Sequence, residues 1–137
     1  MKDKTSVHLT RKHCTLIAAI ASDPNVQKVL PQVLLPNVRG EKRKWANVIN
    51  DKKDCPNVQV IEEQAGWVTN DNLEMYFDIL EESLKPLKIQ KTVIVMDCQP
   101  SHISLRILKT LRKMKWKVLL VPGKLTFLLQ PLDAYFF

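Results

Sequence analysis

The strongest constraint on the fold of this chain is a short apolar run that ends in a carboxylate. Val93 to Met96 contains no polar residue, which is typical of a strand buried on both faces of a sheet. Asp97 follows at once, and a Pro100-Ser101 turn leads into a helical pattern. In open α/β sheets ligands bind beyond the carboxyl ends of the strands, so Asp97 is a candidate for a working acid. The alternative is that Asp97 only caps the following helix or turn.

The first part of the chain predicts an antiparallel hairpin with a long turn. Cys14 to Ser22 is a compact apolar run that indicates a buried strand, and Asp23-Pro24-Asn25 supplies turn chemistry. Val29 to Leu35 predicts the returning strand, which Pro31 restricts to an edge or a bulge.

Two amphipathic helices and three strands are predicted in the rest of the chain. Val58–Ile61, Val93–Met96 and Val118–Val121 read as strands. The first helix is capped by Thr69 or Asn70 and ends at Lys85-Pro86. Its apolar stripe is Leu73, Tyr76, Phe77, Leu80 and Leu84, and its acidic side, interpreted as a solvated face, is Asp71, Glu74, Asp78, Glu81 and Glu82. The second helix has the stripe Ile103, Ile107, Leu111 and Met114.

This order of elements predicts an α/β fold with antiparallel strands first and parallel strands second. The 137 residues correspond to one domain, 1–137. Every apolar run is shorter than the ~20 residues that a membrane-spanning helix needs, and Met1 to Lys4 opens no apolar signal region, which predicts a soluble intracellular chain without a membrane partner. The three cysteines form no disulfide framework, and Cys98 with His102 lacks the second ligand pair that a zinc site needs.

Positive charge is concentrated in one span of the sequence. The net charge is +7, and no Asp or Glu lies between Asp97 and Asp133. That span contains Arg106, Lys109, Arg112, Lys113, Lys115, Lys117 and Lys124. Such segregation indicates binding to a phosphate backbone, although a solvated helix face gives a similar pattern. The sequence contains no Gly-rich phosphate loop, HExxH or GxSxG motif, so nucleophilic Ser or Cys chemistry has little support.

Three linked motifs resemble the catalytic domain of DDE-superfamily transposases, in the pogo/Tigger-like branch related to mariner elements. They are Ala65-Gly66-Trp67-Val68-Thr69 at the start of the acidic helix, Val95-Met96-Asp97-Cys98-Gln99-Pro100-Ser101-His102, and Val121-Pro122-Gly123-Lys124-Leu125-Thr126 running into Leu129-Gln130-Pro131-Leu132-Asp133. The resemblance extends from about Cys14 to the end of the chain.

The resemblance implies an RNase H-like mixed sheet with flanking helices, and nuclear DNA cleavage and strand transfer with two divalent cations, Mg²⁺ or Mn²⁺, held by three carboxylates. Asp97 would be the second acid and metal ligand, Asp133 the third, and His102 a supporting residue. DNA would be the partner, with homo-oligomers as a further expectation. The nucleic-acid contacts would come from Arg106, Lys109, Arg112, Lys113, Lys115 and Lys117.

The chain also departs from the family pattern. Cys98 stands where family members usually have Asn, and the first acid lies on a strand that precedes Cys14 in the family, a role that Asp3 does not match. We therefore expect a partial domain, without the first strand and the last helix. It would bind nucleic acid weakly, hold the metals poorly and not catalyse alone. The alternatives are a domesticated DNA-binding or protein-interaction module without catalysis, and a small α/β ligand-binding domain that uses the crevice at Asp97.

Overall fold

The computed structural model describes residues 14–37, 56–61 and 66–125. Its elements are β1 (Cys14–Ile17), α1 (Pro24–Gln27), β2 (Gln32–Pro36), β3 (Val58–Val60), α2 (Asn70–Leu84), the 3₁₀ helix η2 (Lys85–Leu87), β4 (Val93–Asp97), α3 (Leu105–Lys113) and β5 (Lys117–Val121). The predicted α/β class is confirmed, and the arrangement is compatible with part of an RNase H-like fold.

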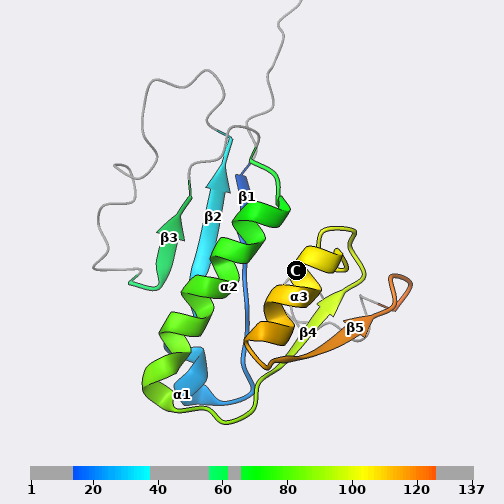
Figure 1. Ribbon diagram of the computed structural model, residues 1–137. Helices are drawn as coiled ribbons and strands as arrows, with labels where there is room; N and C mark the ends of the chain where they lie inside the picture. Colours follow the sequence, from blue (N-terminus) through cyan, green and yellow to red (C-terminus); the bar gives the residue numbers. More distant parts are fainter. Residues whose placement is uncertain (1–13, 38–55, 62–65, 126–137) are drawn as a thin grey trace, which may run out of the picture.

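The described strands form two small sheets. In the first, β1 pairs antiparallel with β2, which confirms the hairpin, and β3 joins β2 in parallel. In the second, β4 and β5 are parallel, as predicted, and Asp97 pairs with Val121 at the shared carboxyl edge. Figure 1 shows α2 across the face of the first sheet and α3 beside it, across the second.

The hairpin differs from its prediction at the turn. β1 ends at Ile17 because the side chain of Gln32 binds both the N–H and the carbonyl of Ala19, which replaces ladder pairing there. Asp23 then caps the one-turn helix α1 through its side chain, where a simple turn was predicted. Pro31 lies before β2, so the edge position predicted for this strand is wrong: β2 is the central strand of its sheet.

The helix α2 follows from its local sequence. The Thr69 hydroxyl accepts from the Asn72 N–H at 3.3 Å, and the Asn72 side chain accepts from the Thr69 N–H at 2.8 Å, which forms a capping box. The predicted apolar stripe is buried along its whole length. Lys85 ends the α-helix as predicted, and Pro86 continues as part of η2.

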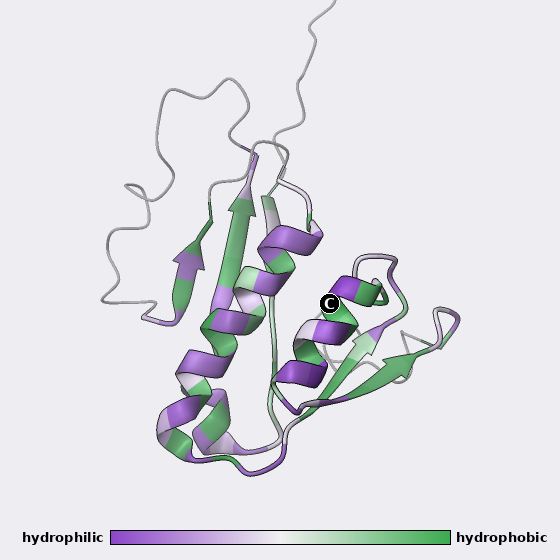
Figure 2. Ribbon diagram, in the orientation of Figure 1, coloured by the Kyte–Doolittle hydropathy of each residue, from purple (hydrophilic) through white to green (hydrophobic). Residues whose placement is uncertain are grey.

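A single core joins the two sheets through the two helices. Val33 and Leu35 of β2 and Ile107 and Leu111 of α3 are completely buried, and they belong to one cluster with the stripe of α2. Figure 2 shows the hydrophobic β2 and β5 and the alternation of hydrophilic and hydrophobic residues around both helices. The stripe predicted for α3 is correct at its centre. At its start Ser104 caps the helix, and Ile103 is exposed.

The prediction that β4 is buried on both faces is wrong. Ile94 and Met96 point into the core, whereas Val93 is 60% and Val95 43% exposed. Leu119, the neighbour of Val95 on β5, is exposed as well. A continuous apolar run shows only that both faces of a strand can be buried. Whether the second face is buried depends on which element covers it, and the sequence of the strand does not contain that information.

Within the described segments, no helix combines the length and the apolar character that crossing a bilayer requires.

Gly66 lies shortly before α2 and packs against Asn37, the residue after β2, where a larger residue does not fit well. Its φ is +67°, and an added Cβ would lie 2.9 Å from the backbone nitrogen of Asn37. The Gly66 carbonyl accepts from the Thr15 hydroxyl at 2.6 Å, and the Trp67 carbonyl accepts from the Asn72 side chain. The described part of this motif, residues 66–69, is thus tied to β1 and to α2.

Replacing Gly66 with Ala is expected to lower the free energy of unfolding by about 2–4 kcal/mol, from left-handed strain and backbone overlap together. Gly123→Ala is the matched control, because a Cβ there meets no atom within 4 Å, and its effect should stay within about 0.5 kcal/mol. Urea denaturation of both variants measures the difference. Equal effects of the two substitutions would contradict this account of Gly66.

Candidate functional site

Asp97 lies at the carboxyl edge of the second sheet, as the sequence predicted. It is the last residue of β4, and 30% of its side chain is exposed. One carboxylate oxygen, Oδ1, accepts from the Gln99 N–H at 3.3 Å, which is the local turn contact that the capping alternative predicts. The same oxygen lies 2.6 Å from Nδ1 of His102. Asp97 therefore makes a turn contact and also holds an imidazole.

The turn after β4 brings His102 back onto Asp97. The N–H groups of His102 and Ile103 both donate to the Gln99 carbonyl, at 2.8 and 3.2 Å. His102 Nδ1 also lies 3.4 Å from the Asp97 carbonyl oxygen, so both of its contacts are with acceptors. Nδ1 therefore carries a proton and donates it to Asp97. The imidazole, 19% exposed, fixes the rotation of the Asp97 carboxylate.

The described residues do not by themselves form a metal site. Magnesium and manganese need several hard oxygen ligands, and no group of three His, Cys, Asp or Glu residues in this part of the chain is placed to hold an ion. Asp97 offers one carboxylate, and Cys98 an exposed thiol. Asp133 and the motif around it lie outside the described residues. The described donors alone thus do not fit a pair of divalent cations.

The sequence predicts that the acidic side of α2 is a solvated face. In the structure, part of this side binds α3. Arg106 of α3 binds Asp71 at 2.6 Å and Glu74 at 2.5 Å. The Thr110 hydroxyl donates to the other oxygen of Glu74 at 2.8 Å. We call these four residues the interhelical clamp. The sequence gives no local signal of this pairing, because Arg106 and Glu74 are 32 residues apart.

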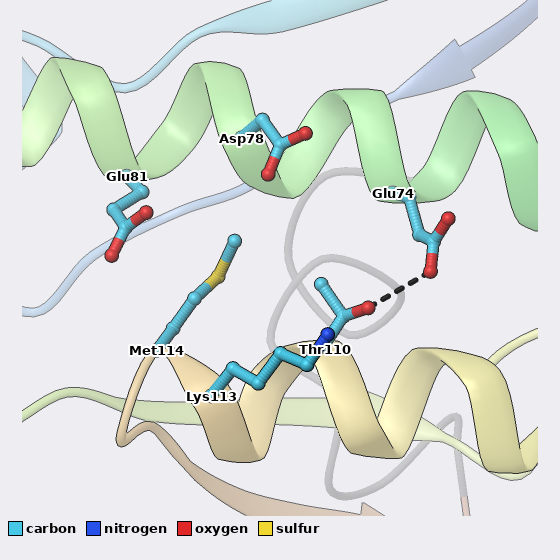
Figure 3. Close-up of a pocket in the computed structure, with 6 residues that line it drawn as sticks. All are labelled: Glu74, Asp78, Glu81, Thr110, Lys113 and Met114. Atoms are coloured by element: carbon cyan, nitrogen blue, oxygen red, sulfur yellow. Dashed lines mark hydrogen bonds between the residues drawn. The ribbon is translucent and has the colours of Figure 1, made fainter.

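Below the clamp, the two helices line a polar groove. Figure 3 shows Glu74 turned toward Thr110, with Asp78 and Glu81 further along α2, facing Lys113 and Met114 of α3. Lys113 thus lines the same groove as three carboxylates. Another acid of this helix, Glu82, forms an ion pair with Lys85, three residues further along the chain.

The clamp changes the ionisation of Glu74. Hydrogen bonds from Arg106 and Thr110 hold the pKa of Glu74 below its ordinary value of 4.5. The same carboxylates raise the pKa of Arg106. At neutral pH Glu74 and Arg106 of the clamp therefore form a charged pair between the two helices.

The other basic residues of the predicted set point to solvent. Lys109, Arg112, Lys113, Lys115 and Lys117 are all exposed. Lys109 lies three residues before Arg112 and four residues before Lys113, so it neighbours both on the surface of α3. The structure thus divides the predicted set: Arg106 is held by α2, and five cations are accessible.

A comparison with protein families matches residues 10–137 to the family described as DDE superfamily endonuclease. Neither the curated proteins nor the solved structures include a significant match to the chain.

We expect Glu74→Gln to lower the free energy of unfolding at neutral pH, because Arg106 loses a charged partner. Since the folded-state pKa of Glu74 is lowered, its contribution is present above 4.5 and is lost as the pH falls through the folded-state value. The difference in urea midpoint between the parent and the variant should therefore shrink between neutral pH and about pH 3. Glu81→Gln, in the same groove, is the control. A pH-independent difference, or an equal loss for Glu81→Gln, would argue against the clamp.

Proposed function

This chain belongs to the DDE superfamily of endonucleases, and we propose that it binds DNA through the exposed cations of α3 and the turn that follows it. The family consists of transposase-type nucleases that act on DNA and generally depend on divalent metal ions. The observation that carries the proposal is the set of five accessible cations in a span without any acid.

The clamp supports this assignment by orienting α3. Ile107 and Leu111 are buried in the core, and Arg106 binds α2, so the helix is fixed on two sides. Lys109 and Arg112 are then left facing solvent. Arg106 was predicted as a nucleic-acid contact too. Because its guanidinium is already bound to two carboxylates, we assign the phosphate contacts to the other five residues.

We further propose Asp97 and Asp133 as metal ligands, with His102 as the residue that orients Asp97. When bound, divalent cations in such sites activate the attacking oxygen and stabilise the leaving one. The 2.6 Å contact with His102 Nδ1 leaves the second oxygen of Asp97, Oδ2, as the one for a cation. This assignment is a prediction for Asp133, which lies outside the described residues. Nuclear localisation and homo-oligomers belong to the same proposal.

A second candidate is a DNA-binding or protein-interaction module without catalysis, the alternative that the sequence leaves open. No cluster of three potential ligands exists in the described part of the chain. A nicking assay with Mn²⁺ separates the two functions. Cleavage that Asp97→Ala abolishes identifies a nuclease, whereas DNA binding without cleavage identifies the module. The third reading is a ligand crevice at Asp97, whereas two grooves in the described part of the chain flank α3 and are lined by other residues.

The proposal predicts a change in the salt dependence of DNA binding. Each phosphate contact contributes about 0.9 to the slope of log K against log salt concentration, so Lys109→Gln/Arg112→Gln should lower the slope by about 2. Lys28→Gln/Lys88→Gln removes the same charge from exposed positions outside α3 and should leave the slope nearly unchanged. Fluorescence anisotropy with a labelled duplex at several salt concentrations gives both slopes. Absence of binding at low salt would refute the proposal.

A further inference from the structure

We propose that a groove between α3 and β5 holds one unpaired base of a DNA strand, with the adjoining phosphate on Arg112 and Lys115. The inference rests on the proposed DNA binding and adds the kind of DNA that is preferred. The groove is lined by Leu108, Arg112, Lys115, Trp116 and Val118, and its volume is about 360 Å³. This volume is at the lower end of the range for small-ligand pockets.

The lining has the chemistry of a stacking site. Trp116 supplies an aromatic ring, and Leu108 and Val118 supply aliphatic walls. The ring of Trp116 packs against Phe77 at 6.5 Å between centroids, with an angle of 88°, so its orientation is set by the core. A preformed aromatic surface binds the face of any base, whatever its identity.

The two cations at the groove match the charge of a nucleotide. Arg112 and Lys115 are both exposed, and in the described part neither forms an ion pair with a carboxylate. This contrasts with Arg106 in the clamp and with Lys113, which lines the acidic groove on the other side of α3. A phosphate beside Trp116 would therefore meet positive charge without a competing carboxylate.

The backbone at the end of α3 places a lysine where glycine is usual. Lys115 has a φ of 61°, and the Trp116 N–H donates to the Leu111 carbonyl at 3.0 Å, as in a Schellman motif. A side chain in this left-handed conformation is strained. The chain turns here from α3 toward β5, and both Lys115 and Trp116 line the groove. Lys88 has a similar φ, 51°, and does not line either groove, which makes it a matched control.

A continuous duplex does not fit this site. Its bases are stacked on each other and expose only their edges in the grooves, so their faces cannot reach Trp116. An unpaired base at an overhang or a gap exposes both faces. Lys109, on the open surface of α3, can contact the duplex backbone beside it. The groove thus predicts a preference for a junction between duplex and single strand.

Anisotropy with a blunt labelled duplex, and with the same duplex carrying a short single-stranded overhang, tests the inference. We expect about tenfold tighter binding of the overhang DNA, from the stacking of one base. Trp116→Leu should remove this preference and leave the affinity for the blunt duplex within about twofold. Trp67→Leu, which changes an exposed tryptophan outside the groove, should keep the preference.

A second pair of variants covers the case in which Trp116→Leu fails to fold. Lys115→Gly and Lys88→Gly both relieve left-handed strain and should both raise the thermal midpoint. Only Lys115→Gly should weaken the binding of the overhang DNA, by about threefold. Binding of both DNAs with equal affinity, or equal effects of the two glycine variants on binding, overturns the groove assignment alone. Failure to bind either DNA contradicts the proposed function instead.

Discussion

The interhelical clamp is the interaction on which the arrangement of this surface depends. Arg106 binds two carboxylates of α2, while Ile107, the next residue, is buried in the core beneath the helix. Ser104, which caps α3, also donates to Asn70 at the start of α2, 3.2 Å away. The beginning of α3 is therefore held at three successive points. Since these contacts use one side of the helix, Lys109 and Arg112 are left for a partner.

The position of α3 also affects the turn that follows β4. The turn between Asp97 and Ser104 is short, so the position of the α3 cap determines where His102 can lie. His102 returns to Asp97 within this turn and fixes the carboxylate. The carboxyl edge of the second sheet is thus joined to the start of α3 by a short, hydrogen-bonded turn, which connects the candidate acid to the helix that carries accessible cations.

Apart from the pairing of β1 with β2 and of β4 with β5, which the order of the elements predicted, the features that sequence analysis predicted correctly are local ones. The stripe of α2 and its cap at Thr69 follow from periodicity and from one side chain next to the helix. The contact between Asp97 and His102 lies within one turn, whereas their roles in chemistry stay predictions. The helix α1 had a usable signal, because Asp23 before Pro24 is a cap followed by proline at the first helical position.

The features that were missed depend on contacts between distant segments. Nothing around Arg106 distinguishes it from Lys109, and only the fold shows that Arg106 faces α2. The exposure of Val93 and Val95 likewise depends on which elements cover the second sheet. The groove at Trp116 combines a helix, a left-handed residue and a strand, so no window of sequence contains its shape.

The central claim is that DNA meets α3 and the residues that follow it, while α2 holds the helix from the other side. Two-dimensional NMR of the ¹⁵N-labelled chain during titration with duplex DNA tests this most directly. The account predicts that the largest shifts fall on residues 109 and 112–117, and that the amides of 71–82 on α2 change little. Shifts concentrated on α2, or spread evenly over the chain, would contradict it.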